Sequence, residues 1–386
     1  TRMSTEKTTN YVSFIWKIAN LLRGDYKEHE YGDVILPFTV LTRLDSVLVS
    51  TKDKVAQIRD QKGVPAEVKR LQYAKATGYP FWNTSKFTLH TLKNDPDNLE
   101  GNLRSYVEGF SPNARDVMKS YDFYTVIDRL DRSDLLYQIV DAFTDPAVDF
   151  SPAAVSNEDM GSIFEELIRR FNELSNETAG EYFTPREVIQ LMVEVLFDPD
   201  MNAICEPGFM ASLYDPGVGT GGMLSEAIER AHELNEEARI EVYGQELNPQ
   251  TYAVAKSDIL IKGDDAERIY FGNSLTADRT AGRTFNYMLC NPPFGVEWKK
   301  YADPIKDEAE KRGSKGRFGA GLPRISDGSF LFLQHMISKM KPYDPADTQN
   351  APGTRIGIVF NGSPLFTGSA GQGESNIRRW ILENDW

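Results

Sequence analysis

The sequence has few of the residues that build disulfide scaffolds or metal centres. Its 386 residues include only two cysteines, Cys205 and Cys290, and four histidines. Two cysteines cannot form a disulfide framework, and so few cysteines and histidines leave no spacing typical of metal ligands. We therefore expect a protein of a reducing compartment, the cytoplasm, with no metal site.

The sequence also lacks an excess of positive charge. Its formal net charge is −14 at pH 7, which argues against this chain alone covering a polyanion, because affinity for nucleic acid depends mainly on neutralising phosphates. Either the chain does not contact nucleic acid, or a basic partner delivers the nucleic acid to it. We find no hydrophobic run long enough to span a membrane and no signal-peptide pattern.

What is present is an ordinary globular composition whose hydrophobic pattern divides the chain in two. Residues 11–58 and 99–150 carry apolar side chains at helical spacing. Residues 143–155 contain two prolines and are expected to form a linker. We predict a helical N-terminal domain over residues 1–150 and a second domain over residues 151–386.

In the second part, short apolar strands alternate with helices. This alternation predicts an α/β fold with a mainly parallel, doubly wound sheet. In such sheets, ligands bind at the carboxyl ends of the strands, near the point where the strand order reverses. We expect strands at residues 212–214, 240–243, 268–271, 285–290 and 355–360.

Glycine or polar residues follow the first three expected strands. The first runs into the turn Asp215-Pro216-Gly217-Val218-Gly219-Thr220-Gly221-Gly222, whose glycines let the backbone approach a ligand closely. This turn has neither the GxGxxG spacing of dinucleotide sites nor the lysine of a phosphate loop. Glu246 ends the second strand, where a carboxylate can accept hydrogen bonds from ribose hydroxyls, and Asn273 ends the third, where it can bond an adenine edge. These groups predict a site for a nucleoside with a charged tail.

The fourth expected strand stops at Asn291-Pro292-Pro293-Phe294. Proline cannot continue a ladder or a helix, so the chain must leave the sheet as a stiff loop. The Asn291 side chain and the Pro292 carbonyl offer hydrogen-bond acceptors, and Phe294 offers a flat apolar face. This set suits a planar ring that bears an exocyclic amine. The alternative is a proline-rich turn with an ordinary core phenylalanine.

Two further segments are candidates for function. In the stretch from Gly180 to Glu187, Thr184 as N-cap, Pro185 as the first helical residue and Glu187 as the third form a capping box. Such a helix start can bind a carboxylate, or it can be a well-capped helix and nothing more. Residues 299–324 are rich in Lys, Arg and Gly; we interpret them as a phosphate-contacting loop or, alternatively, as a solvated loop.

The order of these pieces resembles a known family. DPGVGTGG, GQE, GNSL and NPPF, in this order, resemble S-adenosylmethionine-dependent adenine-N6 DNA methyltransferases. FIWKIANLLRG, YGDVILPFTVLTRLDSVL and GEYFTPREV narrow the resemblance to the methylation subunit of type I restriction–modification systems, over nearly the whole chain. The resemblance implies a Rossmann-like methyltransferase domain, S-adenosylmethionine as cofactor and a flipped adenine of duplex DNA as substrate. It also implies a bacterial or archaeal cytoplasmic enzyme with a specificity subunit as partner and a restriction subunit as an optional further partner.

The resemblance also implies roles for individual residues. Asn291, Pro292, Pro293 and Phe294 would be catalytic, binding the target amine and stacking on the flipped base. Many relatives carry Asp where this chain has Asn273, but Asn keeps a carbonyl acceptor for the adenine of the cofactor. The residues that would bind the cofactor are Glu181, Tyr182, Phe183, Thr184, Pro185, Arg186, Asp215, Gly217, Gly219, Thr220, Gly221, Gly222, Glu246 and Asn273.

The sequence departs from the family in its length. Relatives continue past Trp386 with further strands and a helical region that docks the specificity subunit, so we expect a truncated chain whose sheet lacks edge strands. We see no domain that could recognise a DNA sequence. Two alternatives remain: a methyltransferase acting on a protein glutamine or on RNA, and a cofactor-binding scaffold without catalysis. The N-terminal region and GEYFTPREV disfavour the first alternative, and the intact NPPF disfavours the second.

Overall fold

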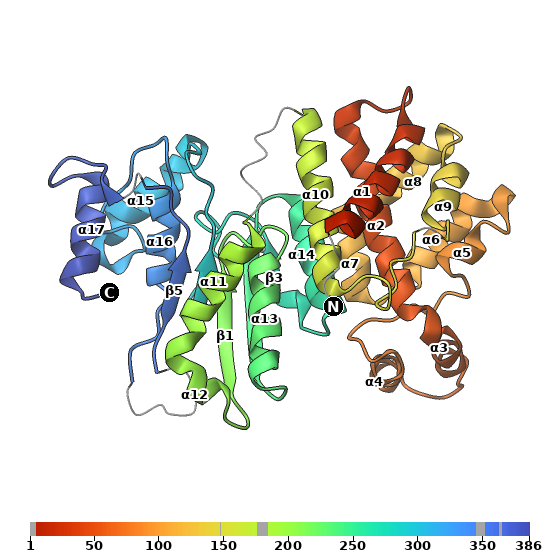
Figure 1. Cartoon of the computed structure of the whole chain (residues 1–386), viewed down its shortest axis with the longest axis horizontal. Helices are drawn as coiled ribbons and strands as arrows, with labels where there is room; N and C mark the ends of the chain where they lie inside the picture. Colours follow the sequence, from red (N-terminus) through yellow and green to blue (C-terminus); the bar gives the residue numbers. More distant parts are fainter. Residues whose placement is uncertain (1–4, 147, 176–183, 345–351, 363–364) are drawn as a thin grey trace. The chain divides into compact units, whose positions relative to one another are not determined.

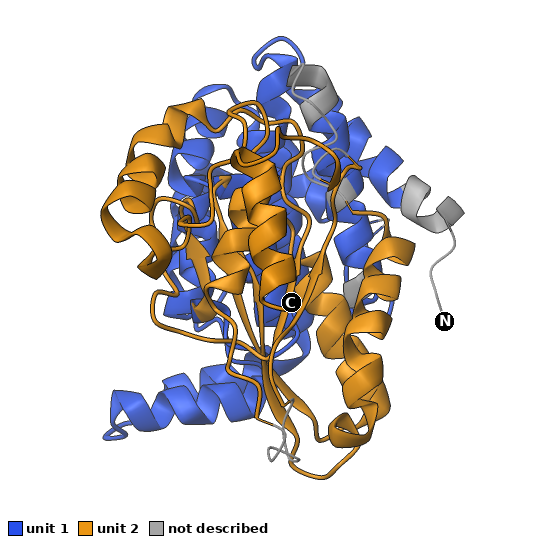
Figure 2. Cartoon of the chain, turned by 90° about the vertical axis from the view of Figure 1, so that its left-hand side faces the viewer, with its two compact units in different colours: residues 1–180, 249–267 blue, residues 181–248, 268–386 orange. Residues whose placement is uncertain are grey.

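The structure is a computed structural model that describes residues 5–146, 148–175, 184–344, 352–362 and 365–386. The chain forms two compact units, which are coloured separately in Figure 2. Unit 1 comprises residues 1–180 and 249–267, and unit 2 comprises residues 181–248 and 268–386. The domain division at residue 150 stays a prediction.

Unit 1 is helical, as the apolar spacing predicted. Most of its helices carry one buried face, and α2 is buried on nearly all sides (Figure 1). The helices of unit 1 are α1 (Thr5–Ala19), α2 (Tyr31–Leu48), α3 (Lys52–Arg59), α4 (Ala66–Thr77), α5 (Leu89–Leu92), α6 (Leu99–Glu108), α7 (Pro112–Ser120), α8 (Phe123–Arg132), α9 (Leu136–Phe143), α10 (Asn157–Ser175) and α14 (Pro249–Ile261).

The segment after α9, which the sequence analysis interpreted as a linker, is packed into unit 1. Phe150 and Val155 are fully buried. The guanidinium of Arg43, on α2, donates to their carbonyl oxygens over 2.5 and 2.9 Å. A buried guanidinium needs acceptors, and these two carbonyls supply them. The linker interpretation is therefore wrong for this segment, because the two prolines mark turns within a packed unit.

The helical stretch Glu28–Arg59 is long and apolar enough to cross a membrane by length and composition. This stretch differs from the expectation that no hydrophobic run is long enough to span a membrane. Within unit 1, 72% of its apolar window is buried, which is the environment of a core helix packed by protein. We therefore attribute its hydrophobicity to the core of unit 1.

Unit 2 contains the alternating strands and helices that the sequence predicted. The strands are between one and four residues shorter or longer than the apolar runs indicated. They are β1 (Met210–Asp215), β2 (Arg239–Glu246), β3 (Ile269–Phe271), β4 (Tyr287–Cys290) and β5 (Arg355–Ile358). The helices are α11 (Arg186–Phe197), α12 (Met201–Ile204), α13 (Gly222–Leu234), α15 (Ala302–Arg312), α16 (Ser329–Ile337) and α17 (Gly373–Glu383).

The five strands form one sheet in the order β3-β2-β1-β4-β5, and every pairing is parallel. Because the order reverses between β1 and β4, the connections on either side of this pair leave toward opposite edges of the sheet. The carboxyl ends of β1 and β4 therefore flank the switch point, where open α/β sheets bind ligands.

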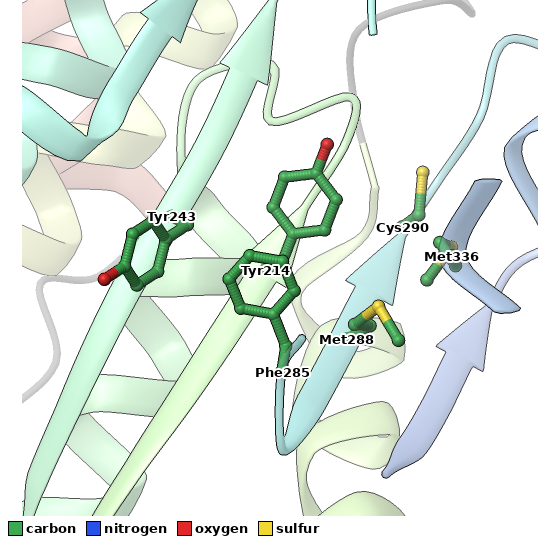
Figure 3. Close-up of a cluster of buried hydrophobic side chains, with 6 residues drawn as sticks. All are labelled: Tyr214, Tyr243, Phe285, Met288, Cys290 and Met336. Atoms are coloured by element: carbon green, nitrogen blue, oxygen red, sulfur yellow. The ribbon is translucent and has the colours of Figure 1, made fainter. Parts of the chain in front are cut away.

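Each face of the sheet packs against helices. On one face, α13 contacts β1 and β2, and α11 contacts β5 (Figure 1). On the other face, Met336 of α16 joins a buried cluster with Tyr214 of β1 and Met288 of β4 (Figure 3). The rings of Tyr214 and Phe285 stack in this cluster with centroids 4.7 Å apart. These two layers hold β1 and β4 in place and so define the position of the loops that follow them.

Candidate active site

The glycine-rich turn after β1 is held by two carboxylates. Asp215 Oδ1 accepts a hydrogen bond from the Gly217 N–H over 2.9 Å, and Glu246 Oε2 accepts one from the Gly219 N–H over 2.8 Å. Gly219 and Gly221 have φ of +54° and +91°, a region that side chains other than glycine rarely adopt. The predicted cofactor residues of β1 and β2 are therefore brought together at the switch edge.

Glu246 is oriented by backbone contacts at both carboxylate oxygens. Its Oε1 accepts from the Asn248 N–H over 2.7 Å, while Oε2 binds the glycine turn. Both oxygens are thereby fixed at the end of β2, where a carboxylate can accept hydrogen bonds from ribose hydroxyls. Gly244 lets the turn lie this close, because a Cβ there would come within 2.9 Å of Val218 Cγ2.

The loop after β3 is joined to the same turn through a residue that the sequence analysis did not single out. Ser274 Oγ donates to the Pro216 carbonyl over 2.5 Å. The adjacent Asn273 uses Oδ1 to accept the Leu275 N–H over 2.8 Å, which orients its amide. The serine was visible in the GNSL motif, but its partner lies 58 residues earlier in the chain and only the fold reveals it.

Asp215 is buried, with 1% of its surface exposed. The pKa of this carboxyl is raised to about 7, mainly by burial and also by the nearby Glu246 carboxylate, while hydrogen bonds from Gly217 and Cys290 oppose the shift. Burial also raises the pKa of the Cys290 thiol, so this cysteine is a hydrogen-bond donor and not a nucleophile. Two carboxyl groups beside a glycine turn make a site that favours a cationic ligand.

Asn291 lies directly after β4, and its amide contacts a residue far away in sequence. Its Nδ2 donates to Thr184 Oγ1 over 2.8 Å. Its Oδ1 is buried and has no hydrogen-bond partner among the described residues. Buried polar atoms are nearly always paired, so an unpaired acceptor at a strand end indicates a place for a donor from a ligand.

The capping box predicted at Thr184 does not form. Helix α11 begins at Arg186 with Pro185 at the N-cap position, and no side chain caps it. The Thr184 hydroxyl accepts a hydrogen bond from Asn291 and does not cap the N–H groups at the start of the helix. The sequence pattern was right about a helix start but wrong about the partner of Thr184, because a tertiary contact competes with the local one.

The rest of the NPPF loop keeps its predicted functional groups available. Pro292 is buried, and among the described residues no hydrogen bond reaches its carbonyl. Phe294 is half-buried, and Gly295, which follows it, turns the chain with φ of +66°. Asn291 and Pro292 thus present two acceptors at one strand end, with an aromatic ring next to them in sequence.

Not every predicted residue reaches this site in the described part of unit 2. Arg186 forms an ion pair over 3.1 Å with Glu226 of α13, which joins two helices on one face of the sheet. Glu181, Tyr182 and Phe183 lie outside the described residues. Across the described ranges, no group of three or more His, Cys, Asp and Glu side chains is arranged to hold a metal ion.

The basic segment after NPPF is ordered around Arg317. This side chain is 15% exposed and pairs with Glu308 of α15 over 2.6 Å. It also donates to the carbonyls of Ser274 and Leu275 over 2.9 and 2.8 Å. Arg317 therefore supports the loop that carries Asn273 and is not available to a phosphate. The interpretation of this segment as a phosphate-contacting loop is wrong for Arg317.

The parallel sheet, its switch point and the polar strand ends define a Rossmann-like methyltransferase fold. The chain is similar in structure to a type I restriction–modification system methyltransferase subunit from Streptococcus thermophilus, with a TM-score of 0.67 and 20% identity over 97% of this chain and 79% of that one. A family model described as N-6 DNA Methylase matches residues 155–386, and one described as HsdM N-terminal domain matches residues 11–143. The chain belongs to the N-6 DNA methylase family. The fold class and the family resemblance predicted from the sequence are confirmed.

Curated relatives are similar over most of the chain. The type I restriction enzyme MjaIX methylase subunit of Methanocaldococcus jannaschii is 24% identical over 98% of this chain and 65% of its own length. The type I restriction enzyme HindI methylase subunit of Haemophilus influenzae is 27% identical over 63% of this chain and 49% of its own length. The chain thus spans between about half and two thirds of the length of these relatives.

Proposed function

We propose that this protein transfers a methyl group from S-adenosylmethionine to the exocyclic N6 amine of an adenine flipped out of duplex DNA, as the methylation subunit of a type I restriction–modification complex. The observation that carries the proposal is the buried acceptor Asn291 Oδ1 at the carboxyl end of β4, which has no hydrogen-bond partner in the described part of the chain. At the same edge of the sheet, β1 ends in Asp215 and the glycine turn, and β2 ends in Glu246.

The residues present fit S-adenosylmethionine. Its methionine part carries an ammonium group, which suits the two carboxyls of Asp215 and Glu246. The Glu246 carboxylate, at the end of β2, suits the ribose diol. The Asn273 amide, whose Oδ1 accepts from the Leu275 N–H, is assigned to the adenine edge. When bound, the cofactor supplies a methyl group that its sulfonium already activates.

The target amine needs help from the protein because its lone pair is delocalised into the ring. Asn291 Oδ1 and the Pro292 carbonyl can accept its two N–H bonds and favour a pyramidal nitrogen, whose positive charge grows as the new bond forms. Phe294 can stack on the extruded base. These residues position the amine and stabilise charge, and no strong general base is required.

The net charge of −14 favours delivery of DNA by a partner. We propose that a specificity subunit supplies the recognition of sequence, that a restriction subunit can join the complex, and that the complex acts in a bacterial or archaeal cytoplasm. The relatives described as methylase subunits of type I restriction enzymes support this assignment.

Transfer of radiolabelled methyl groups tests the proposal. The full chain, with and without the specificity subunit encoded beside it, is incubated with labelled S-adenosylmethionine and with duplex DNA, RNA or protein. We expect label in N6-methyladenine of DNA, dependent on the specificity subunit. Label in RNA or in protein glutamine, or no transfer to any substrate by the reconstituted complex, would contradict the proposal.

A further inference from the structure

Thr184 and Asn291 are 107 residues apart in sequence, yet their side chains meet over 2.8 Å. Thr184 precedes α11, and this helix is fixed to the strand that carries Asn291. The ring of Phe197, at the end of α11, contacts the ring of Tyr287 in β4 with centroids 5.0 Å apart. Met192 and Leu196 of the same helix lie over Gly357 of the neighbouring strand β5. The contact therefore joins two rigid elements of unit 2.

The direction of this hydrogen bond determines which end of the Asn291 amide remains available. An amide has a donor end and an acceptor end that occupy nearly the same space, and the hydrogen-bond network decides between them. Thr184 Oγ1 takes the donor end, Nδ2. The acceptor end, Oδ1, is then the buried atom that no donor of the described residues reaches. A flipped amide would present N–H groups to the N–H groups of a target amine, which repel each other.

We infer that Thr184 is a positioning residue for Asn291, which holds the amide in the orientation that presents Oδ1 to the target amine. This inference rests on the proposed function. It replaces the role of Thr184 as a cofactor ligand or helix cap, since its hydroxyl contacts the catalytic asparagine and no side chain caps α11.

Replacing Thr184 by valine tests the inference, because valine keeps the shape and removes the oxygen. In Thr184→Val the amide loses its partner and populates both orientations. Misplacement of a catalytic group costs up to about a hundredfold in rate, so we expect kcat of the complete complex to fall by about ten- to a hundredfold. The Kd for S-adenosylmethionine, measured by calorimetry, should stay within about twofold of wild type. Thr184→Ser keeps the hydroxyl and should restore most of kcat.

A matched control is Thr284→Val, at an exposed threonine before the opposite end of β4; it should leave kcat and Kd unchanged. An unchanged kcat in Thr184→Val, or a serine variant as impaired as the valine variant, would overturn the inference. So would a raised Kd for the cofactor with normal kcat, which would make Thr184 a cofactor ligand. If valine prevents folding, as judged by thermal melting, Thr184→Ala is compared with Thr184→Ser by the same criteria. Failure of wild type to methylate DNA would instead overturn the proposed function.

Discussion

Asn291 is the residue on which the proposed chemistry depends most directly. Its Oδ1 is buried and has no partner in the part of the chain that the structure describes, and its Nδ2 is held by Thr184. In Asn291→Ala we expect methyl transfer to fall by at least about a hundredfold, which is typical when one preorganised group at the reacting centre is lost. Cofactor affinity should hardly change, because this side chain faces the amine.

Rapid-quench transfer assays and calorimetry measure these two quantities. Asn384→Ala, at an exposed residue after α17, serves as the control and should behave as wild type. Substantial methyl transfer by the Asn291→Ala variant would show that Asn291 is not a catalytic residue.

Glu246 should contribute to the binding of S-adenosylmethionine. Loss of a charge-assisted hydrogen bond costs on the order of 1.5–3 kcal/mol, so Glu246→Ala should weaken binding by roughly ten- to a hundredfold. The variant also frees the Gly219 and Asn248 N–H groups, which loosens the glycine turn. Calorimetry measures the affinity of the variant for S-adenosylmethionine. The control is Glu236→Ala, which changes an exposed residue before β2. Equal affinities of the Glu246 variant and wild type would show that this carboxylate only orders the turn.

Asp215 should make cofactor binding depend on pH. Its pKa in the folded protein is about 7, compared with about 3.9 for an ordinary aspartate. In the protein without cofactor, the raised pKa of Asp215 contributes to the stability of the fold at pH values below the ordinary aspartate pKa. This contribution to stability is lost as the pH rises through about 7. A cationic ligand prefers the ionised carboxylate, so its binding expels the proton. Affinity for S-adenosylmethionine should therefore increase between pH 5.5 and 7, by up to about tenfold per pH unit.

Calorimetry in buffers with different ionisation enthalpies measures this proton release. Asp215→Asn binds more weakly but should lose this pH dependence. Proton release that is absent in wild type, or identical in the variant, would show that the Asp215 carboxyl does not face the cofactor.

At the scale of elements, one buried network holds α15, α16 and the loop after β3 together. The Arg317 guanidinium can only donate, so the Nδ1 of His335 accepts from it over 3.0 Å, and the Nε2 proton of His335 points to the Tyr214 hydroxyl over 2.9 Å. Burial, with Lys339 and Arg317 nearby, lowers the pKa of His335, which keeps the ring neutral. The network positions Ser274 and hence the loop that carries Asn273.

Arg317→Ala should destabilise the protein strongly. Loss of a hydrogen bond to a charged group costs about 1.5–3 kcal/mol. The variant removes the guanidinium from Glu308, which keeps the hydrogen bond from the backbone N–H of residue 317. Lys311→Ala, on the same helix, breaks an ion pair with Asp307 whose side chains are 72% and 61% exposed, and should change the free energy of unfolding by less than about 0.5 kcal/mol. Urea denaturation compares the two. Similar losses in both variants would show that the Arg317 network contributes no more than a surface pair.

At the scale of the whole molecule, charge limits the interaction with DNA. The net charge is −14, and Arg317, in the conspicuous basic segment, is already paired within unit 2. The isolated chain should therefore neutralise few phosphates, so its affinity for duplex DNA should be low, independent of sequence and only weakly dependent on salt. Fluorescence anisotropy across a salt series measures this, with the specificity subunit added as the comparison. Tight binding of one sequence by the chain alone at physiological salt would contradict it.

Much of the site was predictable from the sequence because its signals are local. A strand that runs into glycines, a carboxylate at the end of β2 and two prolines after β4 are each visible within ten residues. Proline excludes the strand from continuing whatever the surroundings. The alternation of strands and helices likewise predicts a parallel sheet with its ligand edge at the carboxyl ends. Hydrophobic periodicity therefore determined the class of fold, the polar groups at the strand ends indicated the site, and the family resemblance supplied the roles of the individual residues.

Tertiary structure alone decided which of these residues meet. The pairing of β1 with β4 joins residues that are 74 positions apart in sequence. It places the glycine turn beside NPPF, and no local pattern encodes it.

 In that register Leu213 lies beside Tyr287, and Tyr214 lies beside Met288. Thr184 looked like a helix cap and instead contacts Asn291, and Arg317 looked like a phosphate ligand and instead pairs with Glu308 and with the carbonyls after β3. In each case a partly buried polar group is satisfied by a partner from a distant segment, and the cost of leaving it unpaired is larger than a local preference. Such partners exist only once the sheet and its helices have packed.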